Sequence, residues 1–109
     1  MSQSLPLLTL TRTASGTVSA ETFVDATGAT ATAGAAALGV ARTNALDGKD
    51  LPVDVLGTTT VIASGAISDG ADLEVAAEGK AVVLSTGVRV AIALQDAVDG
   101  QAFEALLVK

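Results

Sequence analysis

The chain has 109 residues, of which 50% are hydrophobic, but its aromatic residues are two phenylalanines, and cysteine, histidine, tryptophan and tyrosine are absent. Disulfides, thiol chemistry, Ser-His-Asp catalysis and histidine-based metal sites are therefore excluded. Twelve acidic residues against six scattered basic ones give a net charge of −6, without the clustered Lys and Arg that nucleic-acid binding needs.

The apolar residues are mainly Ala, Val, Leu and Ile. Such side chains bury little area each, at roughly 25 cal/mol per Å², so a monomer would have a thin core. Burial of further surface between subunits would remedy this, which favours an oligomer. No run approaches the roughly 18 consecutive apolar residues of a transmembrane helix, so we expect no membrane partner.

Residues 1–14 come first, with a short apolar patch at 5–10 and no basic residue before it. A secretory signal peptide begins with a basic region, so we do not expect one here. We expect residues 1–14 to form an extended N-terminal arm or an edge strand packed on a neighbouring subunit. Residues 15–109 are then expected to form one β-rich domain.

Glycine-containing turn pairs follow at short intervals along the rest of the chain. They are Ser15-Gly16, Thr27-Gly28, Asp47-Gly48, Leu56-Gly57, Ser64-Gly65, Asp69-Gly70, Glu78-Gly79, Thr86-Gly87 and Asp99-Gly100. The runs between them have the usual strand length of about 4–8 residues, and several are rich in β-branched residues. This spacing predicts an all-β, mainly antiparallel domain, folded as a compact sandwich or barrel.

Two segments of similar sequence could form either a strand or a helix. Residues 101–109, QAFEALLVK, would also suit two helical turns, because Ala is the best helix former. The matching segment, residues 49–56, contains Pro52, which would cost about 3 kcal/mol inside a helix. We therefore expect strands for both segments.

The matching segments belong to a longer internal repeat. Residues 41–56, ARTNALDGKDLPVDVL, and 93–108, ALQDAVDGQAFEALLV, share an apolar run, a polar step, an Ala-apolar-Asp-Gly tetrad and a second apolar run. Gly48 and Gly100 stand at the same place in the two copies. We predict a pseudo-twofold β domain in which each half of the chain is one copy, with Asp-Gly at the positive-φ corner of a tight hairpin in each.

Carboxylates are the remaining candidates for chemistry, and they form two groups. The groups are Asp69, Asp72 and Glu74, and Asp47, Asp50 and Asp54. The first could be imagined as calcium ligands but lacks the register of an EF-hand loop, and a turn entering a strand explains it as well. The second alternates with apolar residues, as solvent-facing strand positions do. We expect no catalytic, cofactor-binding or metal-binding residues and no cofactor.

Three further features have ordinary structural explanations. The glycine-rich segments 56–65 and 64–70 lack a lysine in P-loop spacing. Lys80 follows a hairpin-like turn, as the modified lysine of lipoyl and biotinyl domains does, but the flanking residues of those domains are absent. Phe23 and Phe103 have no polar or aromatic companion, so we interpret them as core anchors rather than a ligand-stacking pair.

Three stretches, residues 39–57, 65–82 and 91–108, follow the order of Gly, Ala and Val positions typical of one family. On these stretches the chain resembles the small capsid cement, or decoration, proteins of tailed bacteriophages. The resemblance runs from about Val18 onward and leaves the N-terminal arm uncovered. One departure is AEGK, which stands where the family often has an Asp-Gly turn.

The resemblance implies a β-rich protein that binds the outer surface of the icosahedral head as a trimer, at local threefold positions. It would stabilise the shell by bridging subunits of the major capsid protein, after synthesis in the host cytoplasm. The family has no known catalytic residues, so no enzymatic activity is expected. The contact elements expected are the arm, residues 2–13, and the exposed turns near Asp47-Gly48 or Asp69-Gly70.

Two other classes of function compete with this one. The first is a β-rich repeat module of a bacterial or phage surface fibre or adhesin, whose Thr-, Ala- and Gly-rich strands look alike. Such modules usually lie within longer chains, whereas this chain begins with Met1 and ends in a strand followed by Lys109. The second is a small enzyme subunit that uses carboxylates alone, for which no convergent polar motif is present.

Overall fold

The structure is a computed structural model that describes residues 5–107. Its strands are β1 (Leu5–Thr13), β2 (Phe23–Val24), β3 (Gly39–Ala41), β4 (Asp50–Ile62), β5 (Asp72–Val75), β6 (Ala81–Val83), β7 (Ala91–Ala93) and β8 (Ala102–Leu107). One 3-10 turn, η1 (Ala77–Gly79), joins β5 to β6. Within the described residues no helix is long and apolar enough to span a membrane.

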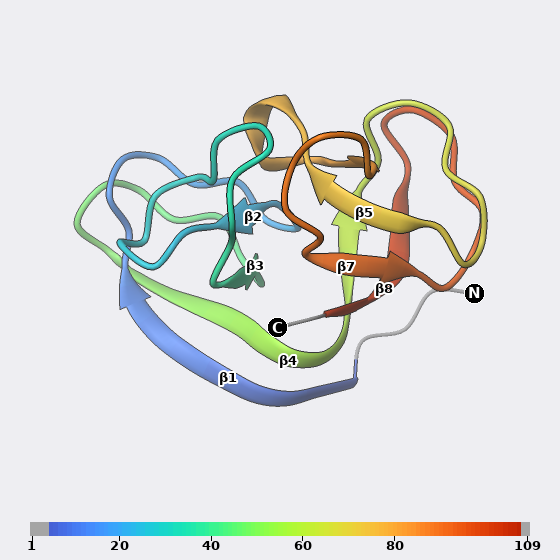
Figure 1. Cartoon of the computed structure of the whole chain (residues 1–109). Helices are drawn as coiled ribbons and strands as arrows, with labels where there is room; N and C mark the ends of the chain where they lie inside the picture. The colour runs from blue at the N-terminus through green and yellow to red at the C-terminus, as the bar shows by residue number, and fades with distance from the viewer. Residues whose placement is uncertain (1–4, 108–109) are drawn as a thin grey trace.

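The strands form one antiparallel sheet that curls into a nearly closed barrel (Figure 1). Their order in the sheet is β2-β3-β4-β8-β7-β5-β6, and β1 pairs with β4 off this path. An isolated bridge between Ala63 and Ala81 brings β6 next to the end of β4. The predicted all-β, mainly antiparallel, barrel-like fold is confirmed, including strands at both Pro52 and the C-terminal segment.

The longest strand, β4, connects the two parts of the barrel. Its first part pairs with β1 and β3, and its second part pairs with β8. Gly57 lies inside the strand with φ of +96°, a conformation that glycine adopts without steric cost. Figure 1 shows β4 running beside β1 and then turning sharply toward β8. The turn predicted at Leu56-Gly57 is therefore wrong as a chain break, and this glycine bends a continuous strand.

The pairings on the two sides of this bend follow the same register. The matched pairs are Val40–Asp54 with Ile92–Leu106, Phe23–Val40 with Asp72–Ile92, and Thr13–Asp50 with Ile62–Ala102. Equivalent positions are separated by a nearly constant number of residues. For β3 and the start of β4 this number equals the separation of Gly48 and Gly100, and for β1 and β2 it is slightly smaller. We call the two sets the first and second halves. A duplication as their origin stays a prediction.

Most of the predicted N-terminal arm is part of this sheet. Residues 5–13 form β1, which pairs with β4 along its length, with two register shifts near Leu8. Within the described residues β1 has a strand on one side alone, so it lies at an edge. Residues 1–4 of the predicted arm lie outside the described part, and contact with a neighbouring subunit stays a prediction.

The core divides into two clusters of buried aliphatic residues. The larger contains both phenylalanines, Phe23 and Phe103, each with no exposed surface. The smaller surrounds Leu51 and Val53 of β4. The interpretation of the two phenylalanines as core anchors is confirmed.

The repeated Asp-Gly pairs shape two equivalent turns. Gly48 and Gly100 both have φ of +82°, and in each turn the next backbone N–H donates to the carbonyl oxygen three residues earlier, at 3.0 Å. The positive-φ corner is therefore confirmed. Each corner lies within a longer connection, residues 42–49 or 94–101, and not in a two-residue hairpin, because these connections also pair with the segments near Val18 and Ile67.

Candidate interaction surface

The first group of carboxylates does not converge on one point. Asp69 is exposed, and the carboxylate of Asp72 faces Arg89 at 3.4 Å. Glu74 is 7% exposed and accepts a hydrogen bond from the backbone N–H of Ser85 at 2.7 Å. A Cβ added at Gly87 would overlap the Glu74 carboxylate, which shows how closely the backbone covers it. The described residues contain no group of three potential metal ligands.

The second group separates in the same way, with one correction. Asp47 and Asp50 are exposed, as expected, and the alternating Leu51, Val53 and Val55 are buried. Asp54, however, is 1% exposed, so its prediction as a solvent-facing residue is wrong. The alternation placed Asp54 on the outer face of β4, but Thr9 of β1 and Arg42 lie over this position.

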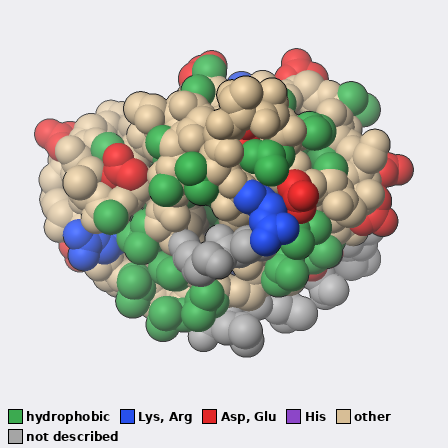
Figure 2. All heavy atoms as spheres, in the orientation of Figure 1, with side chains coloured by type: hydrophobic (Ala, Val, Ile, Leu, Met, Phe, Trp, Pro, Cys, Tyr) green, Lys and Arg blue, Asp and Glu red, His purple; other side chains and the backbone are tan. Residues whose placement is uncertain are grey.

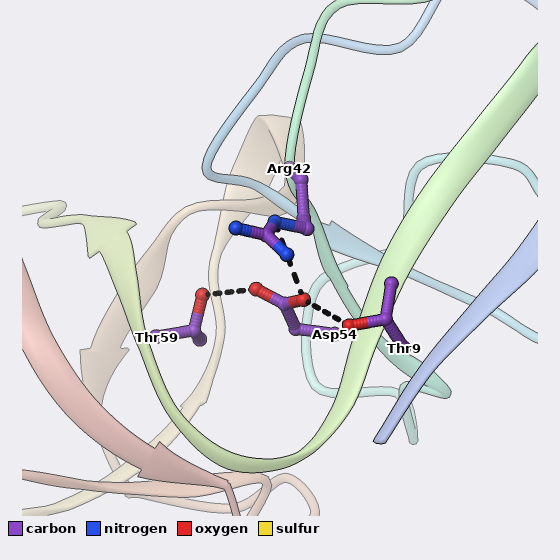
Figure 3. Close-up of polar contacts among 4 residues, drawn as sticks. All are labelled: Thr9, Arg42, Asp54 and Thr59. Carbon is purple, nitrogen blue, oxygen red and sulfur yellow. Dashed lines mark hydrogen bonds and ion pairs between the residues drawn. The ribbon is translucent and has the colours of Figure 1, made fainter. Parts of the chain in front are cut away.

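Asp54 is the centre of a small polar cluster (Figure 3). The hydroxyl of Thr9 donates to Oδ1 at 3.0 Å, and that of Thr59 donates to Oδ2 at 2.9 Å. Nε of Arg42 lies 3.5 Å from Oδ1. Because these residues come from β1, from both parts of β4 and from the segment after β3, the cluster holds the edge strand against the bend.

The cluster allows a double-mutant cycle on the Arg42–Asp54 pair, with alanine at either or both positions. We expect the single substitution Asp54→Ala to lower the free energy of unfolding by about 1–3 kcal/mol, because the buried Thr59 hydroxyl and the Thr9 hydroxyl lose their acceptor. The coupling energy between the two residues should be about 1 kcal/mol. Urea denaturation of the four proteins measures both quantities.

The exposed pair Arg89–Asp72 is the matched control for this cycle, since both its side chains are 47% exposed. Its coupling energy should stay below about 0.5 kcal/mol. Equal coupling in the two cycles would contradict a stabilising role for the pairing of Arg42 with the buried Asp54. At the positions equivalent to Arg42 and Asp54, the second half has Leu94 and Leu106, so the barrel itself does not require an ion pair there.

An apolar groove of about 760 Å³ opens beside this part of β4. The loop between β2 and β3 forms one wall and β4 forms the other. The residues that line the groove are Asp25, Ala26, Thr27, Ala36, Ala37, Leu38, Val55 and Leu56. Leu8 of β1 pairs with Leu56 across the strands, and both side chains are exposed. Figure 2 shows hydrophobic side chains gathered over this part of β1 and β4.

The turn at residues 25–29 fixes the loop wall of the groove. Oδ1 of Asp25 accepts hydrogen bonds from the Thr27 hydroxyl at 2.6 Å, the Thr27 N–H at 2.9 Å and the Ala29 N–H at 3.2 Å. Partial burial acts to raise the pKa of Asp25, but these bonds together outweigh it and lower the pKa below its ordinary value. The wall is therefore formed before any partner arrives.

Neither the groove nor the Asp54 cluster was predicted from the sequence. The groove depends on residues 26–38 lying beside residues 55–56, a contact between distant segments. The one local sequence feature that could have indicated the groove is the run of alanines at 35–37. Small exposed alanines beside exposed leucines form a shallow apolar surface, which suits contact with another macromolecule better than it suits a small polar substrate.

Comparison with known proteins agrees with a role in contacts between macromolecules. The family model for "Phage cement protein" matches residues 2–109. The chain is also similar to a solved structure, the head fiber gp8.5 N base of bacteriophage phi29, with a TM-score of 0.79, 21% identity and coverage of 93% of each chain. At this identity the likeness shows a shared fold. No curated protein matches the chain. The chain belongs to the phage cement protein family and is a structural protein associated with the phage head.

Proposed function

We propose that the chain is a head decoration protein that binds the outer surface of the icosahedral head as a trimer. It stabilises the shell by bridging neighbouring subunits of the major capsid protein. The observation that supports this most directly is the family match over nearly the whole chain. A protein that binds the assembled shell and not its separated subunits raises the stability of the shell by its own binding free energy.

The groove is the surface that we assign to contact between copies of the chain in the trimer. Its walls contain the buried Val55, the partly buried Leu38 and the exposed Leu56 beside alanines, and the exposed Leu8 adds apolar surface at its edge. Burial of this surface would supplement a core whose large rings are two phenylalanines. At roughly 25 cal/mol per Å², even a modest apolar contact repeated at three subunit interfaces contributes several kcal/mol.

The edge strand β1 is the element that we assign to contact with the capsid. Side chains of residues 8–13 are exposed, and within the described residues one side of the strand has no partner strand. An exposed strand edge offers backbone N–H and C=O groups to a strand of another chain. This assignment keeps the expected role of residues 2–13, although β1 is also an integral part of the barrel.

Mixing the purified protein with undecorated heads and imaging them tests the proposal. We expect added density on the outer surface at local threefold positions, and a trimer by mass measurement in solution or on the shell. The absence of added density on the heads would contradict the proposal. A monomer in solution that also binds no heads would favour the fibre module instead.

A second test addresses β1 with the double substitution Thr11→Lys and Thr13→Lys. Lysines on an edge strand oppose pairing with another strand, so we expect head occupancy to fall about tenfold while the melting temperature stays within about 2 °C. This test is gentler than deletion of residues 2–12, which would also remove the Thr9–Asp54 bond. The exposed turn substitution Thr86→Lys is the control, and equal losses in both proteins would contradict the role of β1.

A base module of a surface fibre is the second candidate, and the likeness to a phage head fiber base favours it. The two candidates differ in what projects from the shell. A decoration protein gives a compact knob at each site, whereas a fibre base carries a longer projection. Imaging of native virions distinguishes these two forms directly.

A further inference from the structure

The two equivalent Asp-Gly turns each begin with an exposed aliphatic side chain. Leu46 precedes Asp47-Gly48, and Val98 precedes Asp99-Gly100. Both side chains are 65% exposed, the highest value among the large hydrophobic residues of the described chain. Leu46 and Val98 are equivalent positions in the shared register of the two halves. We call them the tip residues.

Single exposed aliphatic residues are common on protein surfaces and need no explanation, but this pair differs from the others. Other exposed aliphatic residues have no such counterpart in the other half. Leu10, Val88, Leu94 and Leu106 are exposed, and the equivalent positions hold Thr59, Ala36, Arg42 and Asp54, in that order. We compared each exposed large aliphatic residue with the residue at the equivalent position, where the structure describes both. Leu46 and Val98 are the pair in which both positions hold an exposed large aliphatic side chain. The other exposed large aliphatic residues differ between the halves, whereas this feature is present in both.

Each tip turn is held in place by the same side-chain hydrogen bonds. Oδ1 of Asp47 accepts from the N–H of Gly16, and Oδ1 of Asp99 accepts from the N–H of Gly65, both at 2.9 Å. Each turn has a second bond of this kind. Oδ1 of Asn44 accepts from the N–H of Ala20 at 2.7 Å, and Oδ1 of Asp96 accepts from the N–H of Asp69 at 2.8 Å. A turn fixed in this way loses little conformational entropy when a partner binds its exposed side chain.

The two tip turns lie far apart in the molecule. Figure 1 shows the loops that contain residues 45–49 and 97–100 at opposite ends of the barrel, whose longest dimension is 35 Å. One compact site on a partner would not reach both. The same chemical feature at two distant places therefore fits two copies of one partner protein.

The charge beside the tips indicates what each copy offers. Asp47 and Asp99 follow the tip residues directly and are exposed, and the chain has a net charge of −6. An aliphatic side chain with a carboxylate next to it is complemented by a small apolar depression with basic groups at its rim.

From these observations we infer that one protomer binds two copies of the same shell protein, one through Leu46 and one through Val98. Each copy contributes an apolar depression with a basic rim. The inference rests on the proposed function and specifies how bridging is achieved. Two linked contacts raise the overall affinity far above that of either contact, because the second forms within an assembled complex.

The test compares Leu46→Asp, Val98→Asp and the double variant with the wild-type chain, in binding titrations on undecorated heads. Both positions are exposed, so melting temperatures should match the wild type. Val88→Asp is the control for added charge, since Val88 is about half exposed and its equivalent is an alanine. We expect each single variant to bind about tenfold more weakly, by similar factors, and the double variant about a hundredfold or more.

The outcomes separate the inference from the proposed function. If the wild type binds heads and neither tip variant binds more weakly, the inference is overturned and the decoration role stands. The same holds if Val88→Asp weakens binding as much as the tip variants do. A loss confined to one tip also overturns it, because a single contact does not bridge. If the wild type itself does not bind heads, the proposed function and the inference fail together.

Discussion

Replacing Phe103 with alanine is expected to lower the free energy of unfolding by about 3–5 kcal/mol. Phe103 is fully buried in β8, which pairs with both β4 and β7. The larger core cluster that contains it also includes Ala63, Ala91 and Ala93. Such small side chains cannot move into the space that the ring leaves, so a cavity remains. Urea denaturation followed by circular dichroism measures the loss.

Phe103→Leu is the control for this prediction. Leucine keeps much of the apolar volume, and the equivalent position of the first half, Leu51, shows that β4 accommodates it in the same register. We expect a loss of about 1.5 kcal/mol or less. For the alanine variant, a loss below about 1.5 kcal/mol would show that the sheet collapses around the site. The core would then depend less on its aromatic rings than their burial indicates.

Gly28→Ala is expected to be the second large change, with a loss of about 4 kcal/mol or more. Gly28 has φ of +90°, and a Cβ there would overlap the backbone carbonyl oxygen of Thr13 at the end of β1. The carbonyl of Gly28 also accepts from the N–H of Ser15 at 3.0 Å. The substitution therefore strains the turn and pushes it away from β1, which also disturbs the loop wall of the groove.

Gly48→Ala separates these two effects. Gly48 has a similar φ of +82°, but a Cβ added there meets no atom within 4 Å. This variant should show the conformational strain alone, about 1–2 kcal/mol. Thermal and urea unfolding of both variants measure the difference, and similar losses at the two glycines would contradict a close contact between the 25–29 turn and β1.

The strands were predictable because their signals are local. Glycines at short intervals, β-branched runs and Pro52 indicate strands without any knowledge of the partner segment. The Asp-Gly corners were predictable for the same reason, because Gly48 and Gly100 need a positive φ wherever the chain goes next. The repeated spacing also matches the shared register of the sheet, although it does not reveal which strands pair.

The groove and the burial of Asp54 depend on contacts between distant segments. The alternation in β4 indicates which face Asp54 occupies, but not that Thr9, 45 positions earlier, covers it. Gly57 shows the same limit. Its sequence context is that of a turn, yet pairing with β1 on one side and β8 beyond the bend keeps the strand continuous.

The pairing of β1 with β4 has a consequence during synthesis on the ribosome. Nearly half of the chain is made between Thr13 and Ile62, the end of the strand that β1 requires. At about 5–20 residues per second, β1 waits roughly 2–10 s for its complete partner. Contacts between such distant segments also slow folding after release. Because β8 is made after β4 and pairs with its second part, the barrel closes once β8 has left the ribosome, and the exposed strand edges of the nascent chain are most open to mispairing until then.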